Sequence, residues 1–270
     1  MRKKYPTDVT DEEWEMIREF VPEAEWYPNL QKPKHSRRDI IDGIFYRERT
    51  GCQWRNLPHD FPAWNQVHDY YRKWRNDGTI DALHGALRTR VRKQTPHADG
   101  SARDESPTVS IVDSQSTKSS EEGEEERGYD AGKKVKGRKR HLAVDALGLI
   151  LALQVTSASV QDRDGALPLL KKAKREFPTL KTSYMDGAYR GAIKSQIERE
   201  TGMKVNITLR SDIKKKGFEP IPIRWIVERT FGWLNRYRLL SKEFERTISS
   251  SECDIKLCMI RLMLRRLKSA

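Results

Sequence analysis

The order of segments after residue 108 limits the fold more than any other feature of this sequence. Four runs are rich in β-forming residues: "TVSIVD", "RKRHLAVDALGLILALQVT", "LKTSYMDG" and "KVNITL". The second contains "DALG" between two apolar stretches, which is a hairpin signal. Helical periodicity separates the later runs, in "DGALPLLKKAKREF" and "YRGAIKSQIERETG". This order predicts an α/β fold in which helices flank a mixed sheet.

The first hundred residues have a different pattern, that of short helices joined by tight turns. Thr10 and Glu13 form a capping-box pattern ahead of "DEEWEMIREFV", which Pro22 closes, and Ser36 with Asp39 repeats the signal before "IIDGIFYRERT". Two further helical segments follow, "AWNQVHDYYRKWRNDG" and "IDALHGALRTRVRK". This arrangement suits an all-α, helix-turn-helix-like domain that binds DNA, and equally a small helical bundle with a solvated basic face.

Changes in composition, together with a segment rich in proline and glycine, divide the chain into three parts. The segment "KQTPHADGSARDESPT" is polar and broken by proline and glycine, which is typical of a linker. We therefore predict a helical DNA-binding domain over residues 1–95, a linker over 96–107, and a sheet domain with C-terminal helices over 108–270. In the charged stretch 119–141, five glutamates within residues 121–126 precede six basic residues within 133–140. Such runs are usually solvated loop, and we interpret the acidic half in that way.

Net charge indicates the kind of partner. The chain carries 52 Lys and Arg against 39 Asp and Glu, a formal charge of +13, which favours nucleic acid or an anionic membrane surface. Apolar runs of the ~18–20 residues that a membrane span needs are missing, as is a signal-peptide core at the N-terminus, so we expect no membrane association and a cytoplasmic protein. The three cysteines form no CxxC pair, which predicts reduced thiols and no zinc site.

Two aspartates have the same unusual setting. Asp113 and Asp186 each follow a β-rich run and precede small or turn residues. If these strands are parallel neighbours, the two carboxylates emerge side by side at one edge of the sheet. A third acid, Glu228, lies in the helical segment 224–240, whose apolar stripe predicts packing on the core. Simpler roles are open to each: turn capping for the aspartates, and a helix-spaced surface ion pair for Glu228.

Convergence of these three acids would require cations. A like-charge pair at ~4 Å costs about 4 kcal/mol at an effective dielectric constant near 20. Divalent metal ions relieve that repulsion, and ligation by oxygen alone selects Mg²⁺ or Mn²⁺. Two such ions in one site would support phosphoryl transfer at a DNA backbone.

Basic and aromatic residues around these acids are candidates for DNA contacts. They lie on the third predicted helix, in the basic run 133–140 and in the segment 224–240. The candidate DNA-binding residues are Arg72, Lys73, Arg75, Lys133, Lys134, Lys136, Arg138, Lys139, Arg140, Arg224, Arg229, Trp233 and Arg236.

Several blocks of the sequence together are specific. They include "SRRDIIDGIFYRERTGCQWRNLPHDFP" near the N-terminus, then "SIVDSQS", "KKVKGRKRHLAVDALGLIL", "ASVQDRDGA", "YMDGAYRG" and "RWIVERTFGWLNRYRLLSKEFER". On these blocks the chain resembles, over nearly its whole length, the bacterial insertion-sequence transposases of the DDE type, in the insertion sequence five family.

The resemblance implies a ribonuclease H-like catalytic fold and a metal-binding catalytic triad of Asp113, Asp186 and Glu228. It also implies an enzyme that binds the inverted-repeat ends of its element and cleaves and transfers DNA strands with Mg²⁺ or Mn²⁺. Its partners would be double-stranded DNA, from element ends and target, and a second copy of the chain on that DNA, in the nucleoid.

The third block departs from the pattern Tyr-x2-Arg-x3-Glu-x6-Lys of related families. Arg224 and Glu228 match, whereas Ile221 replaces the tyrosine and Asn235 replaces the lysine. Arg236, one residue later, is a candidate for the missing charge. Two other functions remain open at this point: a non-catalytic DNA-binding regulator derived from a transposase, and a ribonuclease H-like nuclease that cuts without joining.

Overall fold

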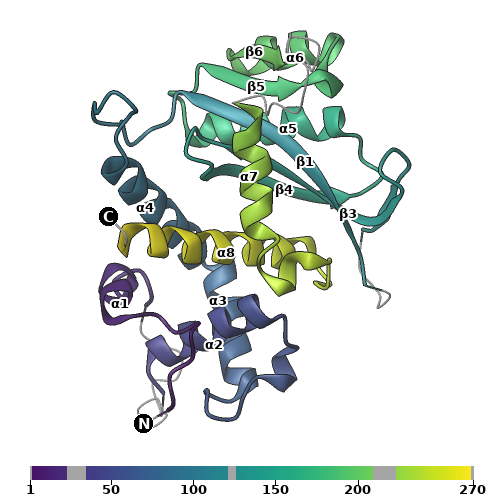
Figure 1. Ribbon diagram of the computed structural model, residues 1–270. Helices are drawn as coiled ribbons and strands as arrows, with labels where there is room; N and C mark the ends of the chain where they lie inside the picture. The colour runs from purple at the N-terminus through teal and green to yellow at the C-terminus, as the bar shows by residue number, and fades with distance from the viewer. Residues whose placement is uncertain (1, 23–34, 121–125, 209–222, 269–270) are drawn as a thin grey trace, which may run out of the picture.

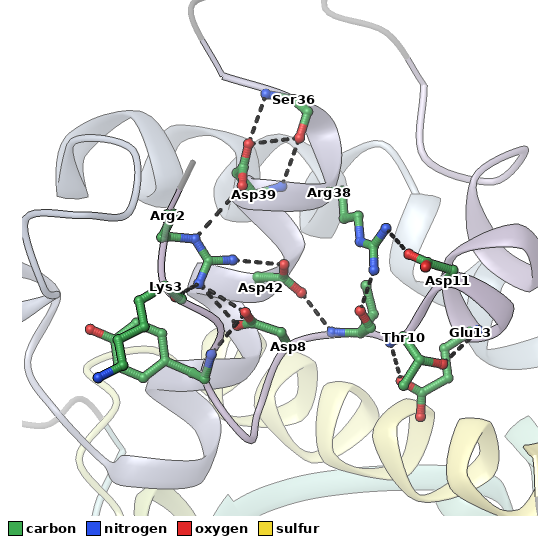
Figure 2. A network of polar contacts seen from close by, with 12 residues as sticks. Arg2, Lys3, Asp8, Thr10, Asp11, Glu13, Ser36, Arg38, Asp39 and Asp42 are labelled. Carbon is green, nitrogen blue, oxygen red and sulfur yellow. Dashed lines mark hydrogen bonds and ion pairs between the residues drawn. The ribbon is translucent and has the colours of Figure 1, made fainter.

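Capping chemistry begins the first two helices, as predicted. The computed structural model describes residues 2–22, 35–120, 126–208 and 223–268. Helix α1 (Asp11–Ile17) starts with a complete capping box: the Glu13 backbone N–H donates to Thr10 Oγ1 at 3.3 Å, and the Thr10 N–H donates to Glu13 Oε2 at 2.8 Å. Ser36 and Asp39 repeat this at α2 (Arg37–Thr50), as Figure 2 shows. The first helix ends earlier than predicted, because the chain tightens into a turn in which the Phe20 N–H donates to Ile17 O.

Two more helices complete the N-terminal region, α3 (Trp64–Asn76) and α4 (Thr79–Gln94). Residues 96–107 then form no helix or strand. The C-terminal helix α8 (Ile248–Lys268) crosses back over α1, α2 and α4, which is visible in Figure 1. Buried polar contacts accompany this packing, because Arg261 Nη1 lies 2.6 Å from Glu13 Oε2 and the Tyr71 hydroxyl donates to Asp254 at 2.7 Å. The two ends of the chain therefore share one core.

The predicted mixed sheet is confirmed. Its six strands are β1 (Val109–Lys118), β2 (Gly128–Asp130), β3 (Val135–Val144), β4 (Ile150–Ser157), β5 (Thr182–Asp186) and β6 (Lys204–Thr208). Their order is β2-β3-β1-β5-β6, with β4 also paired to β3. Pairing is parallel for β1 with β5 and for β5 with β6, and antiparallel for the pairs that include β3. The predicted β3–β4 hairpin is present, with the Gly148 N–H donating to Asp145 O at 2.9 Å.

Two strands differ from the prediction. Strand β1 does not end at Asp113 but continues to Lys118, because β3 pairs with it antiparallel over this whole polar stretch, from Asp113 opposite Leu142 to Lys118 opposite Gly137. The partner residues come from β3, which begins at Val135, earlier than the predicted β-rich run at Arg138. The short strand β2, Gly128–Asp130, was not predicted.

Helices cover both faces of the sheet. On one face, α5 (Asp162–Glu176) and α6 (Ala192–Thr201) pack on a core that includes Val112, Leu169 and Met185. On the other, α7 (Arg224–Leu234) lies across β1 and shares the larger core with Ile111 and with helices α2, α4 and α8 (Figure 1). This second face carries the candidate site.

Candidate active site

The register of two parallel strands brings Asp113 and Asp186 together. The β1–β5 ladder pairs Val109 with Thr182 and Ile111 with Tyr184. Continuing that register by two residues places Asp113 beside Asp186, on the same face because side chains alternate along a strand. The parallel, neighbouring strands that the sequence interpretation required are therefore present, although Asp113 lies within β1 and only Asp186 ends its strand.

Glu228 faces the same side of the sheet. Ile111 and Tyr184 precede the two aspartates by two residues and pack on the core that also holds Val227 and Phe231 of α7. Asp113 and Asp186 therefore point to the face that α7 covers. The next residue after Val227 on this helix is Glu228, whose side chain is 51% exposed. The core-facing stripe of α7 thus sets the third acid at the rim of the strand carboxylates.

Arg224 joins two of the three acids. Its Nη2 lies 3.7 Å from Asp186 Oδ2 and 3.4 Å from Glu228 Oε1. The surface ion pair that was the simpler interpretation of Glu228 is therefore present. In the part of the chain that the structure describes, no three His, Cys, Asp or Glu side chains are grouped closely enough to hold a metal ion. The structure brings Asp113 and Asp186 together directly, and Glu228 to Asp186 through a guanidinium.

Backbone groups orient the two aspartates. Asp113 Oδ1 accepts from the Ser114 N–H at 2.7 Å, and Asp186 Oδ1 accepts from the Ala188 N–H at 2.8 Å in the turn that follows β5. Asp186 therefore does cap a tight turn, which was its simpler alternative. Its second oxygen faces Arg224, so capping and cation binding are compatible at this residue.

Electrostatics make Asp113 a poor isolated anion. Burial, and then the charge of Asp186, raise the pKa of Asp113 to about 6, against the lowering effects of the Ser114 N–H, Arg224 and Lys133. A bound cation reverses such a shift, because it stabilises the charged form. The donor set here is oxygen only, in which hard divalent ions such as Mg²⁺ and Mn²⁺ are favoured. The two strand carboxylates therefore have the chemistry that a divalent ion favours, while Glu228 lies at the rim, paired with Arg224.

Three of the predicted DNA-binding residues are not available to DNA, and the prediction is wrong for them. Arg138, Lys139 and Arg140 of β3 are 0%, 4% and 1% exposed. Arg138 donates to the carbonyls of Glu245 and Arg246, and Arg140 to that of Leu240 and to Glu243. Lys139 Nζ lies 2.8 Å from Asp162 and 3.1 Å from Asp130. Because β3 pairs within the sheet, these three basic side chains are buried and bind carbonyl and carboxylate groups of the protein.

The remaining basic candidates are accessible. Lys133, Lys134, Lys136, Arg72 and Arg236 are exposed, while Lys73, Arg75, Arg224, Arg229 and Trp233 are half-buried. Arg72 and Lys73 also line a cavity of about 470 Å³ on α3. Arg75 donates to Ser250 Oγ of α8 and so partly serves packing. These side chains stay candidates for DNA contacts.

Comparison with known proteins gives the family. Residues 9–84 match a family described as a putative transposase of the IS4/5 family, and residues 104–263 match the transposase DDE domain. The second match covers more than half of the chain. The chain belongs to the DDE transposase family. The resemblance drawn from the sequence blocks is confirmed, as is the ribonuclease H-like fold that this domain has. Members generally use divalent metal ions.

Two curated relatives agree with that assignment. A putative transposase for insertion sequence element IS402 from Burkholderia cepacia is 32% identical over 133 residues, which is 46% of this chain and 62% of the relative. The uncharacterized protein y4sN from Sinorhizobium fredii (strain NBRC 101917 / NGR234) is 30% identical over 79 residues, which is 29% of this chain and 62% of the relative. The chain therefore spans less than two thirds of each. Within the described residues of this DDE transposase family member, no helix is long and apolar enough to cross a membrane.

Sequence reasoning missed one set of residues near α7. Arg49 of α2 and Arg265 and Arg266 of α8 lie around the same cavity as Arg229 and Trp233. Nothing local in "RLMLRRLK" indicates this, because only the packing of α8 against the rest of the chain brings these residues to α7. A signal would have been the excess of arginine over lysine in these helices, since arginine is favoured where phosphate is bound.

Proposed function

We propose that this chain is a DNA transposase that binds the inverted-repeat ends of its insertion sequence and cleaves and transfers DNA strands with divalent metal ions. One observation carries the proposal: the parallel register of β1 and β5 sets Asp113 beside Asp186 on the face that α7 covers. The family match supports the reaction class.

Asp113, Asp186 and Glu228 are the proposed metal ligands, for Mg²⁺ or Mn²⁺ and for two ions per site. When bound, such ions lower the pKa of an attacking water or 3′-hydroxyl and stabilise charge on the leaving oxygen. The protein itself positions the three carboxylates. Backbone N–H groups orient the two aspartates, and the core stripe of α7 brings Glu228 to them.

Arg224 gives the acids a partner when no metal is bound. Its contact with Glu228 joins side chains that are 16% and 51% exposed, and such partly exposed pairs contribute at most about 1 kcal/mol. Replacing this contact by a divalent ion would therefore cost little free energy. Displaced from Glu228, the guanidinium would be free to bind a phosphate of the DNA strand.

The proposed DNA partners are the element ends and the target. The proposed contacts are the exposed Lys133, Lys134, Lys136 and Arg236, together with Arg72 and Lys73 on α3. We further propose that residues 1–95 form the helical DNA-binding region, completed by α8, and that residues 108–270 carry the catalytic domain. Two copies of the chain would assemble on the two ends.

A joining assay tests this function. Labelled duplexes that carry the inverted repeat flanking the gene would be incubated with the protein, Mg²⁺ and a supercoiled target plasmid. We expect strand cleavage at the repeat end and labelled plasmid products. Cleaved ends without labelled plasmid would identify a nuclease, and bound but uncut ends would identify a non-catalytic regulator.

A further inference from the structure

A cavity lined by five arginines lies next to α7, the helix that carries Glu228. Its volume is about 560 Å³, and it lies where α2, α7, α8 and the β3–β4 hairpin meet. The described residues that line it include no Asp or Glu; they are Arg49, Thr95, Leu147, Arg229, Trp233, Arg236, Tyr237, Leu262, Arg265 and Arg266. This composition, arginine with two aromatic rings, suits an anion that bears a planar or apolar group.

The packing at this cavity holds like charges close together. The guanidinium carbons of Arg229 and Arg266 lie 4.6 Å and 4.3 Å from the centre of the Trp233 ring, and both side chains donate to the Leu147 carbonyl at 3.3 Å. Burial, followed by the charge of Arg229, lowers the pKa of Arg266, while Asp145 acts in the opposite direction. Asp145 is itself buried and hydrogen-bonded to Arg92. An added anion would therefore relieve a repulsion that the protein only partly offsets.

The cavity and Glu228 share helix α7 but lie on different sides of it. At about 100° per residue, Arg229 and Trp233 lie about 100° and 140° around the helix from Glu228. At 1.5 Å per residue, Trp233 is about 7.5 Å farther along the axis than Glu228. DNA bound at the acids would therefore cross the solvent-exposed side of α7 to reach the cavity, and phosphates of a strand on that path would meet its arginines.

We infer that the cavity lined by Arg49, Arg229, Arg236, Arg265 and Arg266 binds the sugar–phosphate backbone of the DNA strand that enters the active site. The inference rests on the proposed function in taking DNA as the ligand. Because arginines from α2 and α8 close the cavity over α7, DNA bound there would contact the N-terminal helices, the sheet hairpin and the C-terminal helix at once.

The test is the salt dependence of DNA binding in the absence of metal. Affinity of the full-length chain for a short duplex of arbitrary sequence would be measured by fluorescence anisotropy in EDTA, over a series of salt concentrations. Arg49→Gln with Arg265→Gln removes two charges at the cavity rim, away from the acids. The matched control, Arg175→Gln with Arg199→Gln, removes two exposed arginines from α5 and α6, on the opposite face of the sheet.

We expect the slope of log K against log salt to fall by up to ~1.8 in the cavity variant, at ~0.9 for each lost phosphate contact, with the control close to wild type. Arg49→Lys with Arg265→Lys keeps the charge and should restore most of the slope. Thermal unfolding of each variant verifies that it is folded.

Two results would overturn the inference. One is a cavity variant whose slope equals that of the control. The other concerns a small anion, either inorganic phosphate or a deoxynucleoside monophosphate. If it raises the thermal stability of wild type but not of the cavity variant, and the variant's salt slope for DNA is unchanged, the cavity binds a small free anion instead. Failure of the proposed function would give a different result. The wild-type protein would not cleave DNA in Mg²⁺, but the salt slopes of the cavity variant and the control would still differ in EDTA.

Discussion

Replacing Asp113 by asparagine should stabilise the metal-free protein while it removes the response to metal. The Asp113 carboxyl has a pKa of about 6 in the folded protein, against an ordinary value of 3.8. A pKa raised on folding means that the folded state binds the proton more tightly than the unfolded state. The free energy of unfolding therefore falls as pH rises from about 4 to about 6, and stays lower above that.

The difference between the two pKa values corresponds to about 3 kcal/mol, or about 2 to 3 kcal/mol once the partial exposure of the carboxyl is allowed for. An asparagine side chain at this position would have the shape of the protonated acid at every pH. We expect Asp113→Asn to exceed wild type by at most about 1 kcal/mol at pH 4.5 and by about 2 to 3 kcal/mol at pH 7.5, in EDTA.

Urea unfolding at pH 4.5 and pH 7.5 measures this difference, with the exposed Asp104→Asn as the control variant. With millimolar Mg²⁺ at pH 7.5 the wild type should regain stability by RT ln(1 + [L]/Kd), and Asp113→Asn should not. A stability difference between variant and wild type that is the same at both pH values would refute the environment that we assign to Asp113.

Two further predictions concern packing. Gly165→Ala should destabilise the protein by about 1–3 kcal/mol, because an added Cβ would lie 2.4 Å from the His141 ring. Gly232→Ala should stabilise it by up to about 1 kcal/mol, because nothing lies within 4 Å of an added Cβ there. Urea unfolding of the two variants measures the difference. A fragment of residues 1–105 should fail to fold, because it lacks the helix α8 that packs on α1, α2 and α4; a cooperative thermal transition of that fragment by circular dichroism would contradict this.

Local signals predicted part of this structure well. Capping boxes marked the starts of α1 and α2, and the "DALG" turn marked the β3–β4 hairpin, because each depends on residues within a few positions of one another. Asp186 was selected for a similar reason, since a strand that ends in an acid and a turn has a recognisable pattern. Asp113 was selected from the β-rich run before it, although its strand continues to Lys118. Their juxtaposition needed one further assumption, parallel pairing, which the β1–β5 register confirms.

Long-range packing accounts for what the sequence did not predict. Arg138 and Arg140 have the composition of a solvated basic run, but β3 lies inside the sheet and their guanidinium groups bind carbonyls that are 107 and 100 positions away in the chain. Helix α8 is far in sequence from α4, so no local pattern indicates that they share a core. The contact of Arg224 with both Asp186 and Glu228 likewise depends on how α7 lies on the sheet.

The central claim is that Glu228 acts with the two strand aspartates as a metal ligand in DNA strand cleavage. Glu228→Gln tests it most directly, because the amide keeps the size of the side chain and removes the charge that would bind a cation. The measurement is the rate of cleavage of labelled end DNA in Mg²⁺, beside a gel-shift assay on the same DNA and thermal unfolding of the variant. We predict a rate lower by orders of magnitude, as the loss of several kcal/mol of transition-state stabilisation implies. Binding should be equal or slightly tighter, since one negative charge near the phosphates is gone. Cleavage by Glu228→Gln at a rate near that of wild type would contradict the account, and would leave Glu228 with only its surface ion pair to Arg224.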